Sequence, residues 1–244
     1  MRSAFRRLVP LRLVRLYRRA RLILSRRRNR NRPVQEVFTG IYRENQWGGR
    51  PGQFFSGSGS VGSQASLYVD VVRTFIKEKG ISKVIDLGCG DFAVGGRLLI
   101  SDVRYIGVDV VPALIQRNLD KFGSPNVSFQ CLDIISDDLP NGDLCLIRQV
   151  FQHLSNAQIA KVIAKLTKYD YVIITEHYPA PGVRVVPNKD KPHGADIRVY
   201  DASGVYLDLP PFNMRVSSLL LEVEAGADLV DSGEVIRTFL VHNR

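Results

Sequence analysis

A short apolar run that ends in a glycine turn is the feature that most restricts the fold of this chain. Lys83–Leu87 reads Lys-Val-Ile-Asp-Leu, which is typical of a buried strand, and Gly88, Cys89 and Gly90 follow at once. The segment 92–100 then has the composition of a helix. Strand, glycine turn and helix in this order predict a parallel α/β sheet, in which the glycines let a ligand lie against bare backbone.

The chain continues with further apolar runs at regular intervals. Strands are predicted at residues 105–109, 127–131, 143–147 and 171–175. Ser155 and Asn156 are suited to cap a helix that runs to about residue 168. Strands that alternate with helices in this way indicate a doubly wound arrangement.

Acidic residues close three of these strands. Asp109 ends the second strand, 23 residues after Asp86, where a carboxylate can accept both hydroxyls of a ribose. Asp133 follows the third strand and is placed to reach an adenine edge. Asp86 stands just before the turn that would hold a pyrophosphate, and an acid there repels phosphate. S-adenosylmethionine carries an ammonium and a sulfonium and no phosphate, so these residues favour it over a dinucleotide. The competing interpretation is that Asp109 and Asp133 only cap helices.

Three segments resemble the motifs of class I S-adenosylmethionine-dependent methyltransferases. They are Asp86-Leu87-Gly88-Cys89-Gly90-Asp91, Gly107-Val108-Asp109 and Gln152-His153-Leu154-Ser155, which are similar to motif I, the second-strand acid and the segment after strand four. The resemblance covers about residues 54–176 and implies an α/β fold. That fold is a single doubly wound, mostly parallel seven-stranded sheet with an antiparallel C-terminal hairpin, here from the apolar runs 219–223 and 235–241, preceded by a basic amphipathic N-terminal helix.

The resemblance also implies a cofactor site for S-adenosylmethionine, with S-adenosylhomocysteine as product. The implied cofactor-binding residues are Asp86, Gly88, Cys89, Gly90, Asp109, Val110, Asp133, Ile134 and Gln149. Asp86 and the two glycines would line the methionine portion and Asp109 would hold the ribose. Asp133 would meet the adenine and Gln149 would face the sulfonium. The chain departs from the family at Phe92, where many members carry a third glycine.

The formal net charge of +10 is concentrated at the N-terminus. Residues 1–32 contain thirteen arginines and neither lysine nor acid, whereas the rest of the chain holds 21 basic and 24 acidic residues. An enzyme of nucleic acids usually carries its positive charge on the domain that meets the phosphates. Nucleic acid is therefore a less favoured partner than a small molecule or a glycan.

The basic segment also has helical periodicity, which predicts a helix over about 10–27. Its apolar positions recur every three or four residues, at Phe5, Val9, Leu13, Leu16, Ala20 and Ile23. A basic amphipathic helix is suited to an anionic membrane surface. A docking site for a partner, a mitochondrial targeting peptide, a solvated tail and an RNA-contacting arm are the alternatives. The chain shows neither a membrane-spanning run nor a secretory signal.

Composition and punctuation divide the chain into three parts. Residues 1–33 form the arm, 34–66 a loop-rich lead-in, and 67–244 the methyltransferase domain. The Gly/Ser segment 56–63 of the lead-in is either a linker or a loop that covers the cofactor. The three cysteines, Cys89, Cys131 and Cys145, show no paired spacing, so we expect neither a disulfide nor a zinc site, and a cytoplasmic protein. The oligomeric state is left open.

A long irregular segment after the fifth strand, about 177–213, is expected to bind the acceptor. It leaves from the carboxyl edge of the sheet, where ligands of open α/β folds bind. Its polar composition with a few aromatic residues suits a hydroxylated acceptor such as a sugar. The candidate substrate residues are Asn188, His193, Arg198 and Phe212.

Transfer of a methyl group to an oxygen also needs a base that removes the proton. His153 and His177 follow the fourth and fifth strands and are the candidate catalytic residues, although a lone histidine is more often structural. No cluster of acids has metal-ligand spacing, so no metal is expected. The sequence thus predicts a methyltransferase that acts on a glycan, lipid-linked sugar or small metabolite near a membrane. An RNA methyltransferase that uses the arm and a non-catalytic binding protein are the alternatives.

Overall fold

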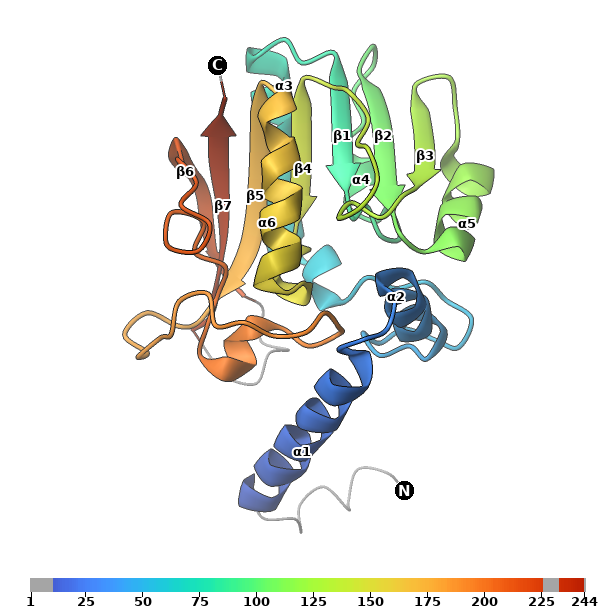
Figure 1. Ribbon diagram of the computed structural model, residues 1–244. Helices are drawn as coiled ribbons and strands as arrows, with labels where there is room; N and C mark the ends of the chain where they lie inside the picture. The colour runs from blue at the N-terminus through green and yellow to red at the C-terminus, as the bar shows by residue number, and fades with distance from the viewer. Residues whose placement is uncertain (1–10, 226–232, 244) are drawn as a thin grey trace.

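The computed structural model describes residues 11–225 and 233–243, and its centre is one seven-stranded sheet (Figure 1). The strand order is β3-β2-β1-β4-β5-β7-β6. β7 runs antiparallel to β5 and β6, and the remaining neighbours pair in parallel. The predicted fold class is confirmed, including the antiparallel C-terminal hairpin. The strands are β1 Lys83–Leu87, β2 Arg104–Asp109, β3 Val127–Cys131, β4 Leu144–Arg148, β5 Tyr171–Tyr178, β6 Ser218–Glu224 and β7 Val235–His242.

Helices cover both faces of the sheet. α6 (Asn156–Lys165) packs on one face, and α3 (Ser63–Glu78) and α5 (Pro112–Phe122) contribute to the core on the other. The central strand β4 is buried from both sides, which explains its unbroken apolar run. Ser155 and Gln158 form a capping box that begins α6, as its sequence predicted. Short 3-10 turns lie at η2 Ser58–Ser60, η3 Phe151–His153, η4 Leu166–Lys168 and η5 Arg198–Asp201.

The helix predicted at 92–100 is much shorter in the structure. Only α4, Gly95–Leu98, is helical. Phe92 adopts a left-handed backbone with φ of 65°, and its ring packs edge-on against Tyr105 and Phe129. The two adjacent glycines at 95 and 96 add little helix propensity. The aromatic packing of Phe92 therefore replaces a helical turn, and the prediction of a longer helix was wrong.

The N-terminal region holds two helices below the sheet (Figure 1). α1 spans Leu11–Asn29, close to the predicted 10–27, whereas Phe5 and Val9 of the predicted apolar stripe lie outside the described residues. α2, Val34–Arg43, stands at the start of a segment that we expected to be loop-rich. None of the helices in the described part of the chain has the length and apolar character needed to cross a membrane.

Candidate cofactor and acceptor site

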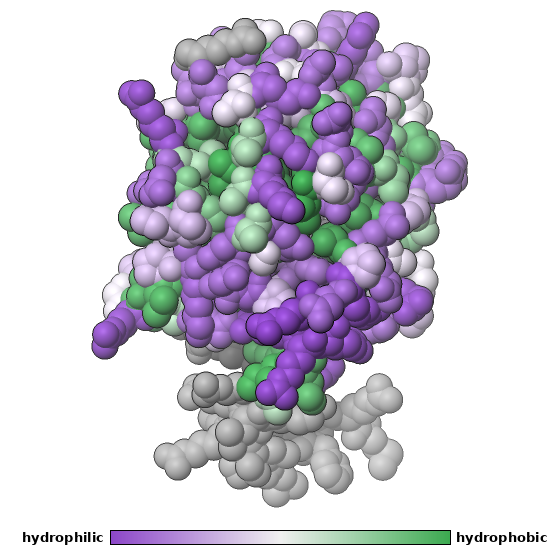
Figure 2. Space-filling model, viewed as in Figure 1, coloured by the Kyte–Doolittle hydropathy of each residue, from purple (hydrophilic) through white to green (hydrophobic). Residues whose placement is uncertain are grey.

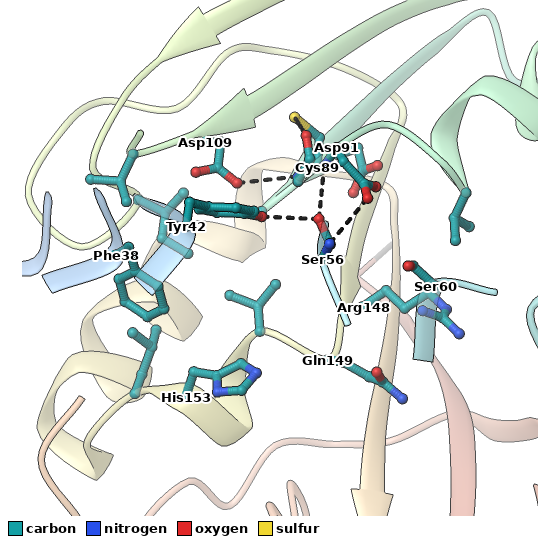
Figure 3. A pocket seen from close by; sticks show the side chains of 18 of the residues that line it. Phe38, Tyr42, Ser56, Ser60, Cys89, Asp91, Asp109, Arg148, Gln149 and His153 are labelled. Carbon is teal, nitrogen blue, oxygen red and sulfur yellow. Dashed lines mark hydrogen bonds between the residues drawn. The ribbon is translucent and has the colours of Figure 1, made fainter. Parts of the chain in front are cut away.

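A pocket opens at the carboxyl ends of the central parallel strands, on the side of the sheet where α2 lies (Figures 1 and 3). Strands that run in parallel bring their carboxyl ends to one edge, so residues far apart in sequence meet there. The pocket is lined by all nine residues predicted to bind the cofactor: Asp86, Gly88, Cys89, Gly90, Asp109, Val110, Asp133, Ile134 and Gln149. The structure therefore gathers these residues at one site.

The glycine turn after β1 is shaped so that only glycine fits. Gly88 and Gly90 have φ of 79° and 54°, a region that other residues rarely adopt. A Cβ on Gly88 would lie 2.4 Å from Val150 Cγ2, and a Cβ on Gly90 would lie 2.4 Å from Ser56 Oγ. The turn therefore presents bare backbone to the pocket and tolerates no side chain at either position.

Two carboxylates flank this turn, Asp86 buried and Asp109 partly buried. The Asp109 carboxylate accepts hydrogen bonds from the amides of Gly90 and Val111, each at 3.1 Å. Asp86 accepts a hydrogen bond from the hydroxyl of Tyr105. Burial raises the pKa of Asp86 and of Asp109 to about 6. Both groups are therefore mostly ionised at neutral pH, and the pocket favours a cationic ligand.

A partly buried arginine, Arg148, lies at the end of β4, close to Asp86. Arg148 donates from Nη2 to the Gly59 carbonyl at 2.6 Å, and its guanidinium lies 5.1 Å above the ring of Tyr68. Its Nε is buried and has no hydrogen-bond partner in the structure. Burial lowers the pKa of Arg148, although the side chain stays charged. Arg148 thus keeps an unused donor beside an anionic turn, and we did not identify it from the sequence.

The Gly/Ser segment lies over the glycine turn and is fastened to it. Ser56 Oγ is 2.9 Å from the hydroxyl of Tyr42 and accepts the Asp91 amide at 2.8 Å (Figure 3). The Ser56 amide in turn donates to the Asp91 carboxylate at 3.0 Å. Gly59 packs so tightly on the Gln149 side chain that a Cβ would lie 2.1 Å from its oxygen. Of the two interpretations left open, this arrangement favours a loop that covers the cofactor over a linker.

An aromatic wall from the lead-in closes another side of the pocket. Phe38 and Tyr42 come from α2, and Trp47 follows it. The Trp47 ring lies 5.2 Å from that of Tyr42 and 5.1 Å from that of His153, centre to centre. No motif in the sequence marks this wall. The spacing of Val34, Phe38 and Tyr42 at intervals of four was the signal that could have revealed it.

His153 lines the pocket and is held in one tautomer. Its Nδ1 lies 3.1 Å from the carbonyl of Gly194, which can only accept, so Nδ1 carries the proton and Nε2 is left as an acceptor. Burial lowers the pKa of His153 to about 4, and the ring is neutral at pH 7. Its Nε2 lies 3.5 Å from the side-chain nitrogen of Gln152.

His177, the second predicted base, lies elsewhere. It stands within β5, which extends further than predicted, and is 3% exposed. Its Nε2 lies 2.9 Å from Oε2 of Glu234 at the start of the last strand, and burial lowers its pKa to about 4. It does not line the pocket. The structure therefore gives no support to a catalytic role for His177.

The four predicted substrate residues also lie away from the pocket wall, and two of them hold the insert together. Asn188 adopts a φ of 53°, and its side chain bonds to backbone atoms of Tyr206 and Pro210. Arg198 is 1% exposed and donates to the carbonyls of Leu154 and Lys189 at 2.8 and 2.7 Å. The Asn188 amide and both Arg198 Nη atoms are bonded to backbone, Arg198 Nε is buried, and neither residue lines the pocket, contrary to the expectation that they face an acceptor.

The other two substrate candidates are packed in the interior. His193 Nδ1 lies 3.1 Å from the amide nitrogen of Gln158, at the first turn of α6. Phe212 belongs to the core beneath α6. Neither lines the pocket. The chemistry of the pocket is instead carried by the lead-in and the strand ends. Within residues 11–225 and 233–243 no group of three His, Cys, Asp or Glu side chains is placed to hold a metal ion.

The strand order and this pocket define the class I S-adenosylmethionine-dependent methyltransferase fold. No protein-family model matches the chain. A curated relative, the malonyl-(acyl-carrier protein) O-methyltransferase of Acetivibrio thermocellus, is 35% identical over 72 residues, which cover 28% of this chain and 25% of that enzyme. The match thus spans a quarter of the relative.

Solved structures support the fold over most of the chain. The N-methyltransferase NodS of Bradyrhizobium japonicum, in complex with S-adenosylhomocysteine, has a TM-score of 0.52 at 13% identity and covers 72% of this chain and 86% of its own. Human N-acetylserotonin methyltransferase with S-adenosylmethionine has a TM-score of 0.52 at 14% identity, covering 91% and 65%. The magnesium protoporphyrin IX methyltransferase of Synechocystis, with bound S-adenosylhomocysteine, has a TM-score of 0.52 at 18% identity, covering 85% and 96%.

Proposed function

We propose that this chain is an S-adenosylmethionine-dependent methyltransferase that acts on a small-molecule acceptor. The observation that carries the proposal is the pair Asp86 and Asp109, one buried and one partly buried, on either side of a glycine turn in a pocket of this fold. These carboxylates repel a phosphate group and attract a cation, so the turn suits a cofactor with a positively charged sulfonium. The neighbouring structures that hold S-adenosylmethionine or its product support the same assignment.

The pocket residues fit the cofactor along its length. Bare backbone at Gly88 and Gly90 accommodates the methionine portion, and Asp109 accepts the ribose hydroxyls. Val110, Asp133 and Ile134 surround the adenine, and Cys89 contributes its backbone to the turn. Gln149 lies near the sulfonium. When bound, the cofactor supplies a methyl group on a positively charged sulfur, which is already activated for transfer.

Arg148 extends this fit to the amino-acid end of the cofactor. A carboxylate is the natural partner for a buried guanidinium whose Nε has no partner. Asp86, at the same end, is suited to the ammonium group. A zwitterionic amino acid would therefore find a complementary pair of charges in Arg148 and Asp86, and neither charge would be left unpaired in the interior.

We further propose that the acceptor is an oxygen nucleophile and that His153 removes its proton. The ring lines the pocket, and its hydrogen bond to Gly194 leaves Nε2 unprotonated and able to accept a proton. The protein otherwise aligns the acceptor with the methyl group and excludes water, for which the wall of Phe38, Tyr42 and Trp47 is suited. Small metabolites, glycans and lipid-linked sugars are the acceptor classes to test, and the relative that methylates an oxygen supports this choice.

We also propose that the arm binds an anionic membrane surface. Ile23 and Leu24 on α1 are 47% and 64% exposed, beside the exposed Arg27 and Arg28. Figure 2 shows apolar surface next to strongly hydrophilic surface where α1 leaves the body. Such a combination partitions into the interface of anionic lipids. The double variant Ile23→Asp with Leu24→Asp should release the protein from phosphatidylserine vesicles in a sedimentation assay.

The function is tested by supplying labelled S-adenosylmethionine and purified protein to fractionated cell extracts. Label in small metabolites, lipid or polysaccharide supports the proposal, and alkaline stability of the product distinguishes an ether from an ester. Label that enters RNA instead would favour the arm as an RNA-binding segment, with affinity that falls steeply with salt. Absence of cofactor binding by calorimetry would contradict the proposal.

A further inference from the structure

The C-terminal end of α1 is held against the insert by one arginine. Arg26 donates from Nε and Nη2 to the Asp196 carboxylate at 3.0 and 2.7 Å, and from Nη2 to Asp201 at 2.5 Å. The side chains of Arg26 and Asp196 are 20% and 8% exposed, so the pair is shielded from water. Two guanidinium nitrogens thus donate to one oxygen of Asp196, and this shielded contact fixes where the end of α1 lies against the insert.

Asp196 is also tied to the interior of the insert. Its other oxygen lies 3.6 Å from Nζ of Lys191, whose side chain is 1% exposed and which also donates to the Gln152 carbonyl at 3.3 Å. Asp196 therefore forms ion pairs both with Arg26 of the arm and with Lys191, which lies beneath the loop that follows β4. Removing Arg26 would take away the shorter of the two ion pairs of this carboxylate and leave the pair with Lys191.

The two residues before Asp196 hold the pocket wall. The Ala195 carbonyl accepts the indole N–H of Trp47 at 3.1 Å. Gly194 donates to the His153 carbonyl at 3.0 Å and accepts from the His153 ring at 3.1 Å. Residues 194–196, which we call the strap, thus contact the arm at one end and two pocket residues at the other.

The arm also contacts the strap through Asn29, which packs against Gly194. Asn29, at the last turn of α1, is 4% exposed, and a Cβ placed on Gly194 would lie 2.8 Å from its side-chain nitrogen. Only glycine, with φ of 159°, leaves room for Asn29 there. Arg26 and Asn29 lie three positions apart and therefore face the same side of the helix.

We propose that Arg26 is a positioning residue for the acceptor side of the pocket. Through Asp196 it fixes the strap, and through the strap it places His153 and Trp47. Arg26 itself does not line the pocket. Its effect on turnover rests on the proposed function, but its effect on the environment of Trp47 does not. The arm would then position residues of the acceptor site in addition to binding a membrane surface.

The chain offers a direct probe, because Trp47 is its only tryptophan. Arg26→Ala should expose the indole, which would shift its emission to longer wavelength and increase acrylamide quenching. Arg28→Ala is the matched control, because Arg28 lies on the same helix, carries the same charge and is exposed. The control should leave both signals unchanged.

The kinetic test separates positioning from folding. Arg26→Ala should raise the acceptor KM about tenfold, as expected for loss of one partner of a shielded ion pair, and leave the calorimetric Kd for S-adenosylmethionine within about twofold. The conservative variant Arg26→Lys, which keeps a cation between Asp196 and Asp201, should retain much of the Trp47 signal. If Arg26→Ala does not fold, Asp196→Asn, which preserves shape, takes its place.

The possible results decide the proposal independently of the enzyme's identity. An unchanged Trp47 emission and quenching in folded Arg26→Ala would overturn it, whatever the protein methylates. A changed Trp47 signal without any methyl transfer would support the strap and count against the proposed function. Equal loss with Arg28→Ala would show that the net charge of the arm matters, and would also overturn a specific role for Arg26.

Discussion

His153 and Gly194 exchange two hydrogen bonds across 41 positions of sequence: the Gly194 amide donates to the His153 carbonyl at 3.0 Å, and the His153 ring donates to the Gly194 carbonyl at 3.1 Å. The second bond places the ring proton on Nδ1 and leaves Nε2 as an acceptor in the pocket. Orientation and protonation state of a proposed base are thus set by backbone rather than by a second acid.

The first prediction concerns this base. His153→Ala should lower kcat about 10²–10³-fold while cofactor affinity changes little, because the ring acts on the acceptor proton. Activity assays and calorimetry on the same preparation check both parts. His177→Gln is the control, since His177 does not line the pocket, and its kcat should match that of the parent protein. Equal losses in the two variants would argue against a base at His153.

The second prediction is a pH dependence of cofactor binding. The pKa of Asp109 is raised to about 6 by burial, so the carboxyl is protonated below pH 6 and ionised above it. Ionisation favours the cationic cofactor, and the Kd should therefore fall as pH rises from 5 to 7, with a limiting slope below pH 6 of about tenfold per pH unit for each of Asp109 and Asp86. Asp109→Asn should bind weakly and respond less to pH, with the remaining response due to Asp86. A pH-independent Kd in the parent protein would contradict this.

The third prediction tests the shape of the glycine turn. Gly88→Ala should destabilise the fold by about 1–3 kcal/mol, because the alanine must adopt a φ of 79° and its Cβ would lie 2.4 Å from Val150. Thermal unfolding measures the loss. Adding Val150→Ala should recover the steric part and leave the backbone strain. No recovery in the double variant would mean that strain alone is responsible.

The fourth prediction concerns Arg148. Arg148→Met keeps the length of the side chain and removes the charge, and should weaken binding of S-adenosylmethionine about tenfold or more. The decarboxylated cofactor analogue lacks the carboxylate and should bind the parent protein and the variant almost equally. If the variant weakens both ligands to the same extent, Arg148 acts through the Gly59 loop instead.

The sequence predicted the sheet and the cofactor side of the pocket because their signals are local. Asp86 and Asp109 each stand at a fixed place relative to their own strand, and parallel strands deliver their carboxyl ends to one edge whatever lies between them. Buried strands can also be recognised in the sequence by unbroken apolar runs, as in β4. For these elements a short window of residues contains the physical cause of the structure.

The acceptor side depended on packing between distant segments, and there local pattern was a poor guide. Histidine and arginine are common in active sites, yet His177 and Arg198 are buried and make contacts within the protein interior instead. Trp47, Arg148 and Arg26 had no motif to mark them. The partner of Arg26 lies 170 positions away, and only the way in which α1 meets the insert decides that pairing. The sequence by itself therefore determined the sheet and the residues that meet at its carboxyl edge, whereas the tertiary structure decided which other side chains line the pocket, because that choice follows from long-range contacts and burial.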